Sequence, residues 1–97
     1  MQRTLNVPTD LDTKQVAIWS MDTTLLLSRQ PAIYGLTTIA YVSCGEVYKI
    51  VKESPTYPDL LSIANELILR SGDRHHVFIE SFEYNEETDQ WMLYTGS

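Results

Sequence analysis

The segment from Thr56 to Gly72 carries the signals that start, continue and stop an α-helix. Asp59 follows Thr56 by three residues, the spacing at which two side chains cap each other's backbone N–H groups. Pro58 suits the first turn, where its missing N–H would have no helical partner. Gly72 suits the left-handed residue that ends a helix. These signals predict a helix over residues 57–71.

One face of this helix is apolar. Its hydrophobic residues follow the i, i+3, i+4, i+7 pattern, and Leu61 and Leu69 widen the stripe. The stripe consists of Leu60, Ile63, Ala64, Leu67 and Ile68. Such a stripe needs a second layer to bury it, so we expect the helix to pack against a sheet.

On both sides of the helix the hydrophobic period changes to two, which is typical of β-strands. Four strands are expected in two hairpins, 36–43 with 46–53 and 75–84 with 90–95. Gly45 lets the first turn, Cys44-Gly45, reach positive φ. The second turn is the polar run 85–89.

Residues 13–30 allow two interpretations. One is a strand at 15–21 followed by a short helix at 22–30 that ends before Pro31. The other is a single helix over 13–30. Periodicity alone does not separate short buried strands from helices, so both stay open, and we favour the first.

The order of elements predicts a single α+β domain over residues 1–97, an antiparallel sheet of four to five strands with the helix on one face. Both faces of the strand at 75–84 are apolar. Phe78, Phe82 and Tyr84 lie on one face, and Val77 and Ile79 on the other. One helix covers only one face, so either the N-terminal segment or a second copy should cover the other. We therefore expect a homodimer.

The net charge of −6 limits the classes of partner. The seven basic residues form no patch, which argues against nucleic acid and against anionic membranes. The N-terminus lacks the apolar core of a signal peptide, and no apolar run approaches the roughly 20 residues that span a bilayer. The single cysteine permits no intrachain disulfide. A cytoplasmic protein is expected.

Most of the net negative charge lies in residues 73–97, which hold six acids and one base and so carry −5 of the total of −6. An acidic, aromatic hairpin is typical of a surface that meets a partner protein, and its charge favours a partner with a basic surface. Acidic residues at its rim would speed association, and exposed aromatic rings would supply affinity. The plainer alternative is that the charge only maintains solubility. The candidate partner-binding residues are Glu83, Tyr84, Glu86, Glu87, Asp89 and Trp91.

Residues with catalytic or metal-binding chemistry are sparse. Adjacent His75 and His76 would point to opposite faces of a strand, and zinc needs three or four ligands. Cys44 has no catalytic signature around it and is expected to be a half-buried thiol at a strand end. The glycines form no phosphate-binding motif. We expect no catalytic residue, no metal and no cofactor.

The sequence therefore favours a small acidic, non-enzymatic protein-interaction module, such as a regulator, an inhibitor or an accessory subunit. Small acidic domains without catalytic motifs are common among phage-encoded proteins that bind host factors, which is an analogy of type only. The alternative is a small-molecule-binding domain or minor enzyme with a pocket near His75, His76 and Cys44.

Overall fold

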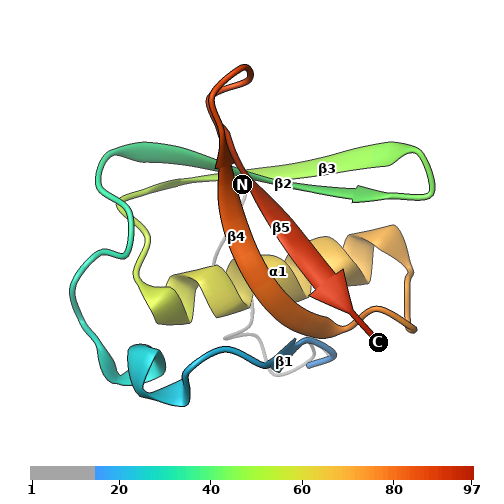
Figure 1. Cartoon of the computed structure of the whole chain (residues 1–97), viewed down its shortest axis with the longest axis horizontal. Coiled ribbons are helices and arrows are strands. Elements are labelled where there is room, and N and C mark those ends of the chain that lie inside the picture. The colour runs from blue at the N-terminus through green and yellow to red at the C-terminus, as the bar shows by residue number, and fades with distance from the viewer. Residues whose placement is uncertain (1–14) are drawn as a thin grey trace.

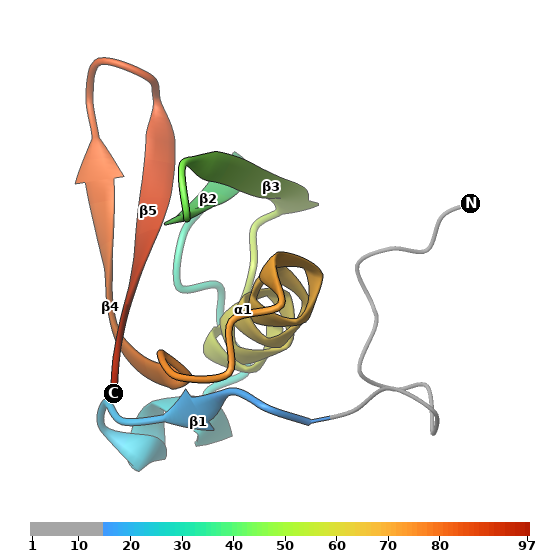
Figure 2. The same ribbon diagram turned by 90° about the vertical axis from the view of Figure 1, so that its right-hand side faces the viewer.

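The computed structural model describes residues 15–97. Its elements are β1 (Ile18–Trp19), the 3₁₀ helix η2 (Thr23–Leu27), β2 (Leu36–Ser43), β3 (Glu46–Glu53), α1 (Tyr57–Ser71), β4 (Phe78–Asn85) and β5 (Gln90–Gly96). The strands form one sheet in the order β1-β4-β5-β2-β3. The sheet curls around α1, with β2 and β3 on one side of the helix and β1 on the other (Figures 1 and 2). The expected α+β architecture is confirmed.

The helix begins and ends where its sequence signals lie. The Thr56 hydroxyl accepts a hydrogen bond from the Asp59 N–H at 3.2 Å, and the Asp59 carboxylate accepts one from the Thr56 N–H at 3.0 Å. Gly72 ends the helix at φ 79°. The whole predicted stripe is buried against the sheet. No helix in the described part of the chain is both long enough and apolar enough to cross a membrane.

The sheet is mixed rather than purely antiparallel. The two hairpins, β2–β3 and β4–β5, are antiparallel as expected. They join each other through a parallel pairing of β2 with β5, and β1 pairs parallel with β4. A parallel pairing needs a long crossover connection, and α1 lies within the one between β2 and β5. The pairing of β2 with β5 is short, consisting of Ile39 with Trp91 and Ala40 with Met92.

Strand β4 differs from its prediction in two ways. It begins at Phe78 rather than at His75, and a bulge at Glu80 interrupts its pairing between Ile79 and Ser81. A bulge adds one residue to a strand and so reverses the alternation beyond it. As a result, Ile79 lies on the same face as Phe82, toward the helix, while Phe78 lies on the opposite face. The expected division of these side chains is wrong at this point.

The N-terminal segment is a short strand followed by a short helix, as favoured from the sequence. Thr13, where the competing single helix would begin, lies outside the described residues. The side-chain oxygen of the fully buried Asn65 accepts hydrogen bonds from the backbone N–H groups of Val16 at 2.7 Å and Ala17 at 2.8 Å. These bonds hold the segment on α1. The described part of the N-terminal segment therefore forms the edge of the sheet beside β4 and contacts α1, and it does not cover the opposite face of the sheet.

Candidate protein-interaction surfaces

The β4–β5 hairpin extends beyond β2 and β3 (Figures 1 and 2). Its turn, residues 86–89, is called the tip. Glu86, Glu87 and Asp89 are all exposed there. Asn85 holds the turn by accepting a hydrogen bond from the Glu87 N–H at 3.0 Å, and Asp89 closes it at φ 56°, a conformation that Asp tolerates better than most residues. Three of the predicted partner-binding carboxylates thus lie together on a projecting turn.

Two predicted aromatic residues lie directly below the tip, on the helix side of the hairpin. Tyr84 and Trp91 are opposite one another on β4 and β5, with ring centroids 5.5 Å apart. The Tyr84 hydroxyl donates a hydrogen bond to the Asp89 carboxylate at 2.6 Å, and this bond raises the pKa of Tyr84 above its ordinary value of 10.0. Tyr84 is 48% exposed, whereas Trp91 is partly buried. The accessible aromatic surface at the tip therefore comes mainly from Tyr84.

Beneath Trp91 lies a cavity of about 230 Å³. Four parts of the chain line it, which are the N-terminal segment (Met21, Leu25), the loop before β2 (Ala32, Ile33), the start of α1 (Tyr57) and the hairpin (Phe82, Trp91). Its walls are mainly apolar. It places an apolar recess next to the aromatic pair of the hairpin.

Glu83 does not share a surface with Tyr84 and Trp91. It is opposite Met92 in the β4–β5 ladder, on the face of the sheet that points away from the helix, and its carboxylate accepts a hydrogen bond from Ser81 at 3.3 Å. The predicted binding residues are therefore divided: two rings face the helix side, three carboxylates form the tip, and Glu83 faces outward.

The face of the sheet opposite α1, called the outer face, is a second candidate surface, and sequence reasoning missed most of it. No element within residues 15–97 packs over this face. It carries exposed apolar side chains on β2, β3 and β5, which are Leu36 (76% exposed), Val42 (52%), Val47 (54%), Val51 (47%) and Tyr94 (48%). A group of large exposed apolar side chains on one face is typical of an interaction site. The sequence signal for this face was the pair of apolar residues on each of β2 and β3, Leu36 with Val42 and Val47 with Val51, which alternate with the residues that face the helix.

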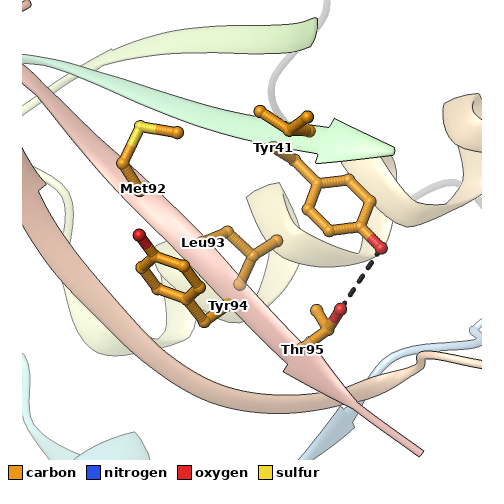
Figure 3. Close-up of a pocket in the computed structure, with 6 residues that line it drawn as sticks. Tyr41, Met92, Leu93, Tyr94 and Thr95 are labelled. Atoms are coloured by element: carbon orange, nitrogen blue, oxygen red, sulfur yellow. Dashed lines mark hydrogen bonds between the residues drawn. The ribbon is translucent and has the colours of Figure 1, made fainter. Parts of the chain in front are cut away.

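An opening of about 250 Å³ lies between β2 and β5, where the two strands diverge beyond Ala40 and Met92. On the outer face Val42, Met92 and Tyr94 border it. On the helix side the Tyr41 hydroxyl and the Thr95 hydroxyl lie 3.2 Å apart and bridge the strands (Figure 3). This opening makes the outer face uneven rather than flat.

The histidines have a structural role in the loop before β4. The Asp73 carboxylate accepts hydrogen bonds from the backbone N–H groups of His75 at 2.7 Å and His76 at 3.1 Å, and its second oxygen is 2.9 Å from the His76 ring. The bond from the His75 N–H, followed by the contact with the His76 ring, lowers the pKa of Asp73 to about 2. The Asp73 side chain therefore fixes this turn and delays the start of β4.

Cys44 lies in the β2–β3 turn and is exposed, so the expectation of a half-buried thiol is wrong. Its backbone lies in the left-handed region at φ 52°. The alternative of a pocket near Cys44, His75 and His76 finds no support in the two cavities described above, because none of these residues lines either of them. Within residues 15–97, no group of three or more histidine, cysteine and acidic side chains is placed to hold a metal ion.

Comparison of the chain with models of protein families, with curated protein sequences and with solved structures found no match.

Proposed function

We propose that this chain is a non-enzymatic protein-interaction module that forms a homodimer through its outer face and binds a partner protein through its hairpin tip. The observation that carries the proposal is the open apolar outer face. Because α1 packs on the opposite side and no element within residues 15–97 covers this face, the face is open to contact with another molecule. A second copy is the simplest occupant, since a two-fold axis places one patch against itself.

The tip supports the second part of the proposal. Glu86, Glu87 and Asp89 project together, and no base in residues 73–97 other than Arg74 offsets their charge. A partner with Lys or Arg at the contact would be attracted to this turn. Tyr84, held by Asp89, would supply the buried contact area that gives affinity. We expect the partner to be a protein with a basic surface.

A capture experiment with matched charge variants tests the partner. Wild-type protein, the double variant Glu86→Lys with Glu87→Lys, and the control Glu46→Lys with Glu66→Lys are immobilised and exposed to lysate of the source organism. The control makes the same change in charge on β3 and α1, away from both the tip and the outer face. A partner of the tip should be retained by wild type and by the control and lost by the tip variant, as read by quantitative mass spectrometry.

Association and dissociation rates with that partner then distinguish the contribution of the tip carboxylates from the contribution of the Tyr84 side chain. The tip variant should associate more slowly at low salt and more like wild type at high salt, because exposed charges are screened over about 8–10 Å at physiological ionic strength. Tyr84→Ala should mainly speed dissociation. Equal association rates for wild type and the tip variant at low salt would mean that the tip only keeps the protein soluble.

A further inference from the structure

The cavity beneath Trp91, called the recess, is large enough to accept a side chain from another molecule. Met21, Ile33, Phe82 and Trp91 line it and are only partly buried, whereas Leu60 is 2% exposed and lies deepest. Within residues 15–97, no charged side chain lines it. Its volume is about 230 Å³. A cavity of about 150 Å³ with apolar walls holds a benzene molecule, so the recess has room for one Leu, Met or Phe side chain.

Contacts along the hairpin connect the recess to the acidic tip. Trp91 lines the recess, and its ring centroid is 5.5 Å from that of Tyr84. The Tyr84 hydroxyl in turn donates a hydrogen bond to the Asp89 carboxylate at 2.6 Å. Glu86 and Glu87 follow Tyr84 by two and three residues, which is at most about 7–10 Å of extended chain. An apolar recess and a group of carboxylates thus lie within reach of one short peptide segment.

The charge beside the recess comes from the hairpin. Residues 78–96 contain five acids and no base. Residues 15–35, which line the other side of the recess, contain one acid and one base, Asp22 and Arg29, and are neutral. A side chain that enters the recess therefore lies beside a purely anionic hairpin. This charge favours a segment that carries Lys or Arg next to its apolar residue.

We infer that the recess binds one Leu, Met or Phe side chain of the partner protein, in a segment whose Lys or Arg residues, two to three positions away, meet the tip carboxylates. The inference rests on the proposed binding of a partner at the tip, and it specifies the chemistry of the bound segment. Burial of the apolar side chain supplies affinity, and the charges at the exposed tip orient the segment and speed its association. Tyr84 contacts the segment between these two points.

Two methionines report where a peptide binds, because they lie on different surfaces. Met21 lines the recess, and Met92 borders the opening on the outer face. Protein that is isotope-labelled at its methionine methyl groups is titrated with a short peptide that carries Phe and, three residues later, Lys-Arg. The Met21 methyl signal in the nuclear magnetic resonance spectrum should shift, and the Met92 signal should not.

Matched peptides and variants separate the recess from the tip. Replacement of the peptide's Phe by Ala should weaken binding about tenfold or more, because the apolar burial is lost. Ala32→Leu adds a larger side chain to the lining of the recess and should weaken binding of the Phe peptide similarly. Thr23→Leu adds the same side chain at an exposed position of η2 outside the recess and should not. Glu86→Lys with Glu87→Lys should weaken binding at low salt. Amide spectra verify that each variant folds.

The outcomes are distinguishable. A shift of the Met21 signal, with weaker binding of the Ala peptide and of the folded Ala32→Leu variant, supports the inference. Equal affinities for the Phe and Ala peptides, an unmoved Met21 signal, or no binding at millimolar peptide overturns it, while the capture experiment with the tip variant decides separately whether the tip binds a partner. A shift of Met92 instead assigns the peptide to the outer face, and a Met21 shift that follows protein concentration without peptide assigns the recess to a second copy. Either result also overturns the inference.

Discussion

Replacing Asn65 with Leu should detach the N-terminal segment from the helix. Leu has the same number and branching of side-chain heavy atoms but no hydrogen-bond acceptor, so the Val16 and Ala17 N–H groups lose their partner. An orphaned buried polar group costs about 1–3 kcal/mol, and the Ala17 N–H is fully buried while that of Val16 is only partly so. We expect a loss of about 2–5 kcal/mol, a large part of the 5–15 kcal/mol that stabilises a typical domain.

Urea unfolding and amide hydrogen exchange measure this loss. The amides of Val16 and Ala17 should lose protection first, followed by that of Ile18, which bonds to the Val77 carbonyl at 2.8 Å. Glu66→Leu is the matched control, because it adds the same side chain at the next helical position and breaks only an exposed ion pair with Arg70. It should change stability by under about 0.5 kcal/mol. Equal losses of stability in the two variants, or unchanged amide protection at Val16 and Ala17, would refute the role of Asn65 in holding the N-terminal segment on the helix.

Two further predictions concern turns. Asp73→Asn should be less stable than wild type near neutral pH. The difference in stability should shrink as the pH falls from about 4 toward 2, because a carboxylate with a lowered pKa stabilises the fold only while it is charged. A difference in urea midpoint that does not change with pH would contradict this. Cys44→Asn should stabilise the protein by about 0.5–1 kcal/mol, because Asn tolerates the left-handed backbone of this turn, where Cys44 and Gly45 both have positive φ. Cys44→Ser is the control that removes the thiol alone, and an equal gain from both changes would assign the effect to the thiol instead.

Elements with local signals and the pairing within each hairpin were predictable, whereas the pairing between the two hairpins was not. The capping residues Thr56 and Asp59 define the start of α1 from within four residues of sequence, and Gly45 does the same for the first hairpin. The parallel pairing of β2 with β5 depends on how two distant hairpins meet around the helix. No periodicity in either hairpin encodes that contact, so the mixed sheet is found only in the structure.

The candidate interaction surfaces were likewise predictable only where they depend on residues close together in the sequence. The acids of the tip are consecutive in sequence, so their grouping needs only the hairpin. The bulge at Glu80 could not be read from the alternation, and it reverses the face on which Phe78 lies. The outer face depends on which side α1 covers, and the stripe on α1 does not specify that side. Asn65 was visible as a polar residue beside the apolar stripe, but its partners lie almost fifty residues away.

The two proposed surfaces are compatible because they occupy different parts of the hairpin. Glu86 and Glu87 project from the turn, whereas Met92 and Tyr94 lie along the body of β5 on the outer face. A homodimer formed through the outer face would carry two tips. A partner with two basic sites could then bind both tips at once, and linked binding strengthens attachment without any new contact. Val42→Glu, which changes the outer face and does not touch the tip, should weaken attachment to a bivalent partner while leaving the association rate of a single tip unchanged.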